Sequence, residues 1–277
     1  MVLSRHAACL LAAALGLPLL GAVSGEAVYR KVCQNCHESG DSRAPGREQL
    51  RTMSAARIVR TLDFGIMMSI TSFLTREERH AVASYLGTSA ETTALPATAY
   101  CADRTVKVPA KPKVSWNGWS PEPTNTRFQT APGLSIEQVK NLKLKWAFGF
   151  DGDVNAFAPP AVLDDQMFVG SAGGDVQALD AKTGCIRWVY AADGPVRTAM
   201  LVAPRGAGKY SLLFADQTGW FYSVDAATGK LLWRRKPETH EATKLTGTPA
   251  VHNGIVYVPT ASWEENRALN AQYECCT

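Results

Sequence analysis

Apolar positions follow two different periods along the chain, and the change between them divides the sequence. Between residues 26 and 90 the apolar residues recur three or four positions apart, as on one face of a helix. From residue 115 onward they form short alternating runs separated by turn-forming residues, which predicts β-strands. Residues 91–114 have neither period and are rich in Ala, Thr, Lys and Pro. We therefore expect an all-α domain over 26–90, a linker over 91–114 and an all-β domain over 115–277.

The helical part contains clear helix-start patterns. Ser54 stands where an N-cap is expected, directly before apolar residues at helical spacing. Thr75 and Glu78 form a capping box, in which Thr75 caps the helix and Glu78 reaches back to it. Gly87 is placed to end that helix. A short helix is also expected from Glu26 to Val32.

The first 25 residues have the layout of a secretory signal. A polar start at Arg5 and His6 is followed by an Ala- and Leu-rich run and then by small residues. Cleavage is expected after Ser24 or Gly25. The apolar run is short for a membrane helix of about 20 residues, and no second such run follows. These features predict a periplasmic protein with no membrane span after signal cleavage.

Charge and composition narrow the possible partners. The chain has 277 residues, of which 46% are hydrophobic and 19% charged, as in ordinary globular proteins. The net charge of +4 is too weak to predict a nucleic-acid partner, which requires a basic stripe.

A Cys-x-x-Cys-His run at residues 33–37 carries the strongest chemical prediction. Cys33 and Cys36 lie one helical turn apart, so both can bond to the vinyl groups of one porphyrin, while His37 binds the iron. A thioredoxin-like pair would follow a strand rather than a helix. A zinc site would need a second Cys or His pair nearby, and only His80 lies between His37 and Cys101. We therefore expect covalently bound haem c.

The sixth iron ligand is expected in Gly65-Ile66-Met67-Met68. This segment resembles the Gly-x-Met that small bacterial cytochromes c carry before their last helix, which favours Met67 and leaves Met68 as the alternative. The same resemblance implies that the last helix crosses the first, with Tyr85 at or near Tyr29. Pro45 lies where such cytochromes offer a backbone carbonyl to the ring of the ligand histidine, and this contact would fix its tautomer.

A repeat runs through the all-β part. Ala178-Leu179-Asp180-Ala181-Lys182-Thr183-Gly184 leads to Trp188, and the same pattern leads to Trp233 after an offset of 45 residues. Leu144-Lys145-Trp146 resembles the tail of an earlier copy. A strand-rich repeat of about 45 residues is typical of a four-stranded propeller blade, with a two-sheet sandwich as the alternative. In the Asp-Ala-x-Thr-Gly turn the Asp and Thr can bond to local backbone and the Gly can take a positive φ.

The repeat resembles the tryptophan-docking motif of dehydrogenases that use pyrroloquinoline quinone (PQQ), whose propellers have eight blades. A cytochrome placed before the propeller resembles the cytochrome-type polyvinyl-alcohol dehydrogenases. This resemblance implies that an alcohol, polyvinyl alcohol or another secondary alcohol, is oxidised with PQQ and Ca²⁺. It also implies that haem c passes the electrons to an external acceptor, such as a small cytochrome c or the respiratory chain.

The same resemblance suggests residues for the quinone site. Adjacent Cys275 and Cys276 would form a strained disulfide ring facing PQQ. Arg197 and Glu265 are weaker candidates for PQQ contacts, with a surface charge or a structural ion pair as the alternative. With these and the haem cysteines assigned, Cys101 and Cys185 are left to pair in an oxidising compartment.

Residues 115–277 would make only about three to four blades at this period, so we expect an incomplete propeller and the N-terminal part of a longer protein. The catalytic base stays unknown, and these residues alone are expected not to oxidise alcohols. The alternative function is an electron-transfer cytochrome fused to a scaffold propeller that binds no quinone.

Overall fold

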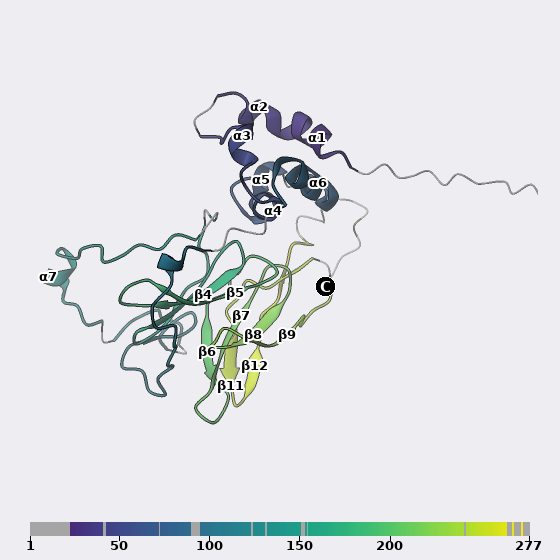
Figure 1. Ribbon diagram of the computed structural model, residues 1–277. Coiled ribbons are helices and arrows are strands. Elements are labelled where there is room, and N and C mark those ends of the chain that lie inside the picture. Colours follow the sequence, from purple (N-terminus) through teal and green to yellow (C-terminus); the bar gives the residue numbers. More distant parts are fainter. Residues whose placement is uncertain are drawn as a thin grey trace, which may run out of the picture.

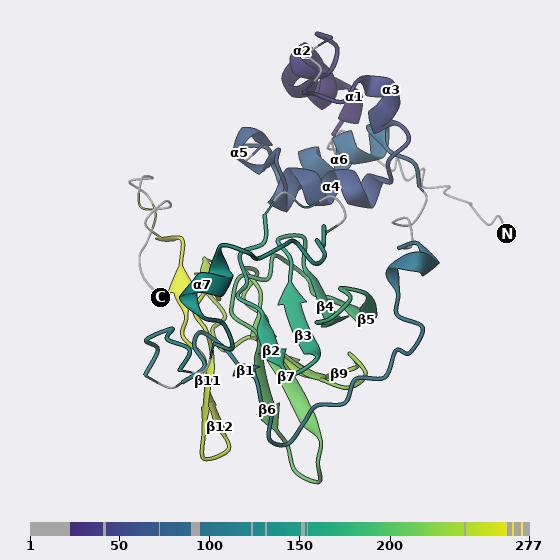
Figure 2. The same ribbon diagram turned by 90° about the vertical axis from the view of Figure 1, so that its left-hand side faces the viewer.

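Most of the helices lie apart from the strands in the computed structural model, and the exception is α7 Ile136–Val139, which belongs to the strand-rich part (Figures 1 and 2). The helices of the first ninety residues gather on one side, and the sheets lie below them in Figure 1. The structure describes residues 23–40, 43–71, 73–89, 95–122, 124–130, 132–150, 153, 155–240, 242–264, 268 and 273.

The helical domain is built from short helices. Their bounds are α1 Gly25–Val28, a π-helical turn Tyr29–Cys33, α2 Gln34–His37, α3 Arg47–Leu50, α4 Ala55–Phe64, α5 Met68–Thr71 and α6 Arg76–Leu86. α1, the π-helical turn and α2 follow one another without a break. A 3₁₀ turn, Ala97–Ala99, follows in the segment between the two domains.

The predicted helix caps are present. The hydroxyl of Ser54 accepts a bond from the backbone N–H of Arg57 at 3.1 Å and starts α4. Thr75 and Glu78 form both bonds of the capping box, at 3.1 and 2.8 Å. Gly87 ends α6 in an extended conformation, and a Cβ there would lie 2.6 Å from the backbone nitrogen of Ala55. Glycine at position 87 therefore allows close packing against Ala55, and its φ is not positive.

α1 crosses α6, as the resemblance to small cytochromes c implied. A Cβ on Gly25 would overlap the backbone of Ala81, so the absence of a side chain lets the two helices approach. Tyr29 then packs against Tyr85, with ring centroids 5.9 Å apart. The core around this crossing consists of Val28, Tyr29, Leu50, Ile58, Leu62, Leu74, Val82, Ala83 and Leu86.

The strands form two larger sheets and two smaller ones. The first sheet has the order β1 Ser115–Trp116, β2 Ala161–Leu163, β3 Gln166–Gly170, β4 Asp175–Asp180 and β5 Ile186–Ala191. The second contains β6 Leu201–Pro204, β7 Tyr210–Ala215, β8 Phe221–Asp225 and β9 Leu231–Arg235. The two-stranded sheets pair β10 Thr243–Lys244 with β13 Ala261–Ser262, and β11 Ala250–His252 with β12 Ile255–Tyr257. All pairs within these sheets are antiparallel.

The first sheet differs from the predicted blade of four strands, because β1 adds a fifth. The carboxylate of Asp164 accepts bonds from the backbone N–H groups of Lys113 and Val114 at 2.8 and 2.9 Å. These bonds align the incoming chain so that Ser115 pairs with Leu163. The second sheet has the four strands that the repeat predicts.

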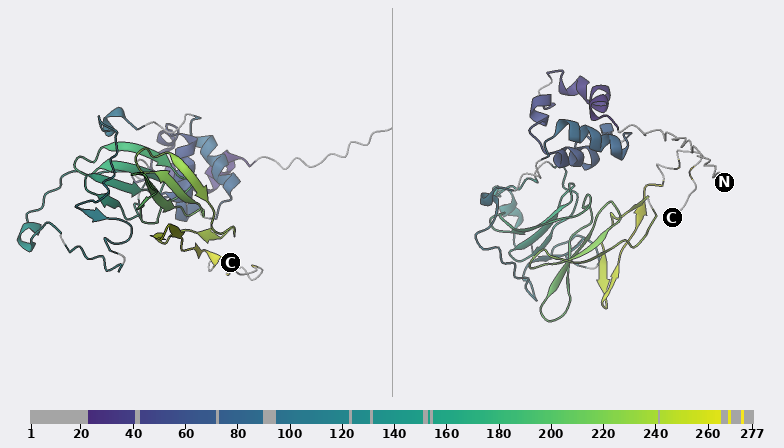
Figure 3. Two further views of the ribbon diagram at one scale, coloured as in Figure 1. Left: turned by 90° about the horizontal axis from the view of Figure 1, so that it is seen from below. Right: turned by 45° about the vertical axis from the view of Figure 1, so that its right-hand side comes forward.

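Tryptophan contacts join successive repeats, as the resemblance to the tryptophan-docking motif implied. The indole N–H of Trp188 donates to the backbone oxygen of Ala226 at 3.1 Å, and that of Trp146 donates to Ala181 at 3.2 Å. A Cβ on Gly229 would lie 2.6 Å from the Trp188 ring, and one on Gly184 would lie 2.7 Å from the Trp146 ring. Each indole thus rests on the turn of the next repeat, and the two larger sheets lie side by side (Figure 3).

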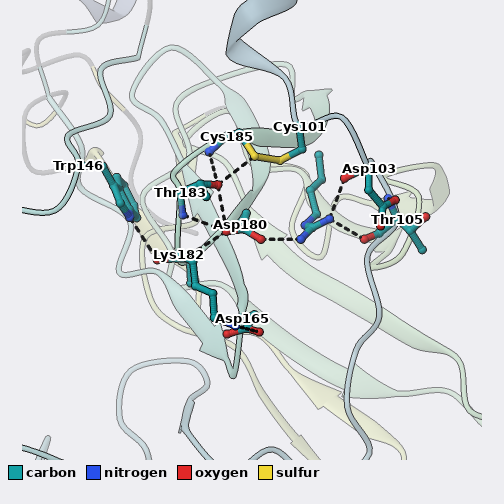
Figure 4. Close-up of polar contacts among 11 residues, drawn as sticks. Cys101, Asp103, Thr105, Trp146, Asp165, Asp180, Lys182, Thr183 and Cys185 are labelled. Carbon is teal, nitrogen blue, oxygen red and sulfur yellow. Dashed lines mark hydrogen bonds and ion pairs between the residues drawn. A yellow bond between two sulfur atoms is a disulfide. The ribbon is translucent and has the colours of Figure 1, made fainter.

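The turns have the predicted hydrogen bonds, and Figure 4 shows those of the first turn. One carboxylate oxygen of Asp180 accepts bonds from the backbone N–H and the hydroxyl of Thr183, at 2.9 and 3.0 Å, and Gly184 has a φ of +76°. Asp225 and Thr228 repeat this arrangement at 3.0 and 3.1 Å, and Gly229 has a φ of +69°.

Cys185, directly after the first of these turns, forms the predicted disulfide with Cys101 (Figure 4). The backbone N–H of Cys101 also donates to the oxygen of Ile186 at 2.9 Å. The disulfide therefore ties the end of the linker to the first sheet.

No helix among the described residues is both long and apolar enough to cross a membrane.

Candidate haem site and its surroundings

The Cys-x-x-Cys-His segment lies on α2 and on the π-helical turn before it. Single π-helical turns inserted in helices are frequent at functional sites. Cys33 and Cys36 are both free thiols; Cys33 is half-buried and Cys36 is exposed. Burial, and to a lesser extent the nearby Cys36, raises the pKa of the Cys33 thiol. Both sulfurs are thus unpaired, as covalent attachment to a porphyrin requires.

His37 is held by the contact that the sequence suggested. Its Nδ1 atom lies 2.8 Å from the backbone oxygen of Pro45. Since a carbonyl oxygen only accepts, Nδ1 carries the proton and donates it to this bond. The lone pair of the imidazole is then on Nε2, which is the nitrogen left to bind a metal ion. The donor set of two thiols and one oriented imidazole fits a covalently held haem.

Met67 lies between α4 and α5. Gly65 ends α4, and a Cβ there would lie 2.8 Å from the Cα of Thr61, so glycine suits this turn. The hydroxyl of Thr71 lies within bonding distance of the backbone oxygens of Leu62 and Met67, at 2.9 and 2.8 Å. The buried Thr71 therefore fixes the backbone at Met67.

Burial separates the two candidate methionines. Met67 packs against the core cluster of the helical domain, and Cys33 packs against the same cluster. Met68 is 43% exposed. Met67 and Cys33 thus pack against the same core of the helical domain, whereas Met68 lies at the surface.

Apolar side chains around Met67 face outward. Ile66, Ile70 and Phe73 are 64%, 51% and 68% exposed. A group of exposed apolar side chains in a small domain indicates a surface that packs against something apolar. A porphyrin has apolar faces, so the composition of this segment fits the haem as well as the donor set does.

Sequence reasoning missed Arg47, which lies between the two crossing helices. Its guanidinium stands 5.2 Å from the ring centre of Tyr29 and 5.3 Å from that of Tyr85, and it donates to the Tyr85 hydroxyl. The Tyr29 hydroxyl donates to Glu38 at 3.1 Å. Burial, followed by the bond to Glu38, raises the pKa of Tyr29 to about 12. These contacts stabilise the packing of the two helices next to Cys33. No local sequence pattern predicts them, because they join residues that are distant in the chain.

Of the residues suggested for the quinone, the structure describes only Arg197. Arg197 is exposed, and its guanidinium lies 5.6 Å from the ring centre of Phe157. Glu265, Cys275 and Cys276 lie outside the described residues.

Comparisons with known proteins agree with the two-domain layout. Residues 21–86 match the family model described as cytochrome C oxidase, cbb3-type, subunit III. Residues 138–271 match the PQQ-repeat model described as outer membrane protein assembly factor BamB. This chain joins a cytochrome c domain to PQQ-type propeller repeats.

The similarity to some relatives extends over both parts of the chain. The chain is 36% identical to a polyvinylalcohol dehydrogenase from Sphingopyxis sp. over 274 residues, which cover 92% of this chain and 41% of that protein. It is 34% identical to a polyvinylalcohol dehydrogenase from Pseudomonas sp. over 96% of this chain and 43% of the relative. A quinohemoprotein alcohol dehydrogenase from Comamonas testosteroni is 29% identical over 48% of this chain and 20% of its own length. The chain thus spans about two fifths of the polyvinylalcohol dehydrogenases that it matches.

Proposed function

We propose that this chain belongs to a periplasmic quinohaemoprotein that oxidises an alcohol with PQQ and passes the electrons to haem c. The observation that supports this most is the joining of a cytochrome c domain to PQQ-type repeats, which extends the similarity to polyvinylalcohol dehydrogenases over nine tenths of the chain. A secondary alcohol, with polyvinyl alcohol as the first candidate, is the proposed substrate. A small cytochrome c or the respiratory chain is the proposed acceptor.

The proposed haem site uses the side chains described above. Cys33 and Cys36 would hold the porphyrin covalently, and the Nε2 atom of His37 would be one ligand of the iron. Met67 would be a second ligand through its thioether sulfur. The haem, once bound, supplies one-electron oxidation and reduction. The bond from His37 to the Pro45 carbonyl keeps the imidazole in the required tautomer and orientation.

The propeller would contribute one side of a quinone site. PQQ is an acidic cofactor that accepts two electrons, and Ca²⁺ would act beside it as a Lewis acid. The exposed guanidinium of Arg197 suits a carboxylate of such a cofactor, and its cation–π contact with Phe157 orients it. Glu265 and the pair Cys275–Cys276 are the other proposed contacts in this chain.

A second function is an electron-transfer cytochrome whose propeller is a scaffold. The match of residues 138–271 to a model described by an outer-membrane assembly factor favours it. This second function shares the haem site of the first and differs from it in the absence of a quinone.

The deciding experiment follows the haem spectrum of the protein expressed with its signal from its complete open reading frame. A haem-staining band that survives denaturing electrophoresis tests covalent attachment, and Cys33→Ala with Cys36→Ala is the matched control. The haem should then be reduced by a secondary alcohol when PQQ and Ca²⁺ are present, and it should stay oxidised when either is left out. Dithionite-reducible haem that no alcohol reduces would contradict the dehydrogenase and support the scaffold.

A further inference from the structure

Arg60 of α4 reaches out of the cytochrome domain and ends between two carboxylates of the propeller. Its Nη2 atom lies 3.3 Å from an oxygen of Asp175, at the start of β4, and its Nε atom lies 4.0 Å from an oxygen of Asp153. α4 and α5 lie on the side of the cytochrome domain that faces the sheets, while α1 and α2 lie on the far side (Figures 1 and 3). The charges therefore meet where the two domains approach each other.

The propeller presents these carboxylates in a fixed arrangement. Asp153 has only 5% of its side chain exposed, and its second oxygen accepts the backbone N–H of Gly173 at 2.9 Å. The hydroxyl of Ser171 accepts the N–H groups of Gly173 and Asp175, at 3.1 and 3.0 Å. A Cβ on Gly173 would overlap both the guanidinium of Arg60 and the carboxylate of Asp153. The turn from Ser171 to Asp175 thus leaves room for one guanidinium.

A short tether brings Arg60 back to these carboxylates. Thr88 bridges to Ser54 at the start of α4, so this end of the tether belongs to the cytochrome domain. Tyr100 bridges to Ile186, and the disulfide of Cys101 fixes that end to the first sheet. The residues between Thr88 and Tyr100 reach about 40 Å when fully extended. A short tether gives one domain an effective concentration on the order of 1 mM near the other domain. At this concentration even a weak contact between the domains can determine whether they are docked.

We propose that Arg60 is the docking residue of the cytochrome domain and that Asp153 and Asp175 are its receptor on the first sheet. Docking of this kind needs neither an alcohol nor a cofactor, so it goes beyond the proposed function. α4 leads directly into Gly65 and Met67, so the contact also sets the place of the proposed iron ligand relative to the propeller. Because electron tunnelling weakens exponentially with distance, an undocked cytochrome domain would accept electrons from the propeller more slowly.

The expected effect follows from the burial of the pair. Arg60 and Asp175 each have 26% of the side chain exposed, and Asp153 has 5%. Pairs in such positions lie between the weak surface ion pairs and the strongly coupled buried ones. Removing the guanidinium also leaves Asp153 buried without its cation. We expect Arg60→Gln to lower the docking equilibrium constant about tenfold, which corresponds to about 1.4 kcal/mol.

Small-angle X-ray scattering of the full chain measures docking through its maximum dimension. The wild type should be compact at about 0.1 M salt and should extend towards 1 M, because the screening length falls from about 10 Å to about 3 Å. Arg60→Gln should be extended already at low salt and should respond little to added salt. Arg51→Gln is the matched control: it removes the same charge from an exposed pair with Glu48 inside the cytochrome domain, and it should behave as the wild type.

Two further variants test the propeller side. Asp175→Asn should extend the molecule as Arg60→Gln does, and the charge exchange Arg60→Asp with Asp175→Arg should restore part of the compaction at low salt. Circular dichroism of each variant establishes that both domains are folded. The proposal is overturned if folded Arg60→Gln and Asp175→Asn are both as compact as the wild type at low salt. It is also overturned if Arg51→Gln extends the molecule as much as Arg60→Gln does. Neither result depends on haem reduction by an alcohol, so the proposed function is tested separately.

Discussion

Replacing Gly229 by Ala tests the contact that joins the first and second sheets. Gly229 has a φ of +69°, and an added Cβ would lie 2.6 Å from one carbon of the Trp188 ring and 2.7 Å from another. The ring cannot retreat easily, because Trp188 is 7% exposed and its N–H is bonded to Ala226. The substitution therefore introduces two costs, one from the backbone and one from the packing.

The two costs can be separated with a control glycine. Gly208 has a φ of +70°, and nothing lies within 4 Å of an added Cβ there. Gly208→Ala should therefore carry the backbone cost alone, about 1–2 kcal/mol. Gly229→Ala should add an overpacking cost of about 1–3 kcal/mol. Its total of about 2–5 kcal/mol is a large share of a typical free energy of unfolding of about 5–15 kcal/mol.

Urea unfolding followed by the β-sheet circular dichroism signal measures both variants. The midpoint should fall much further for Gly229→Ala than for Gly208→Ala, with similar slopes. In a Trp188→Ala background the overpacking cost should disappear, so Gly229→Ala should then cost no more than Gly208→Ala does. If the two glycine variants lowered the free energy of unfolding equally in the wild-type background, the reasoning would be refuted, because the clash with the indole would then add no cost.

Three other outcomes follow from the structure. Met67→Ala should abolish the weak absorption band of the methionine–iron bond at the red edge of the oxidised spectrum, and Met68→Ala should keep it; the reverse pattern would make Met68 the ligand. Cys101→Ser should lower the free energy of unfolding by about 2–4 kcal/mol in chemical denaturation, and reductant should then have no further effect; free thiols at this position in non-reducing peptide maps would contradict the disulfide. Burial opposes ionisation of Asp180, but the bonds from Thr183 and Lys182 and the charge of Arg187 together outweigh it and lower the pKa of Asp180. Because an unfolded Asp titrates near pH 3.9, this stabilisation is present above about pH 4 and is lost as the pH falls through the depressed folded pKa. Asp180→Asn should flatten that part of the acid melting curve, and an unchanged curve would rule out the assignment.

Much of this fold could be predicted because its signals are local. The turn bonds from Asp180 to Thr183 span three residues, and so does the capping box from Thr75 to Glu78. The tryptophan-docking motif of the repeat also implies contact with a neighbouring repeat, and Trp188 makes such a contact with Ala226. The pairing of Cys101 with Cys185 followed by elimination once the other cysteines had been assigned.

Other features depend on contacts between distant residues and left no local pattern. Trp146 makes the predicted tryptophan contact, yet no strand is formed around it. The fifth strand β1 forms because the carboxylate of Asp164 accepts hydrogen bonds from the backbone N–H groups of Lys113 and Val114, which lie much earlier in the chain. Arg60 and Arg47 each look like ordinary surface cations in the sequence, and only the folded chain shows what they contact.

The disulfide between Cys101 and Cys185 gives this protein a problem of maturation. In the proposed haem site, attachment of the porphyrin would consume the thiols of Cys33 and Cys36, which would have to stay reduced until the porphyrin arrives. A compartment in which Cys101 and Cys185 form a disulfide can also oxidise Cys33 and Cys36 to a disulfide, because thiolates attack any accessible disulfide. If the chain is exported as proposed, the order of events matters: Cys101 and Cys185 have to be oxidised while a reductant keeps Cys33 and Cys36 as thiols.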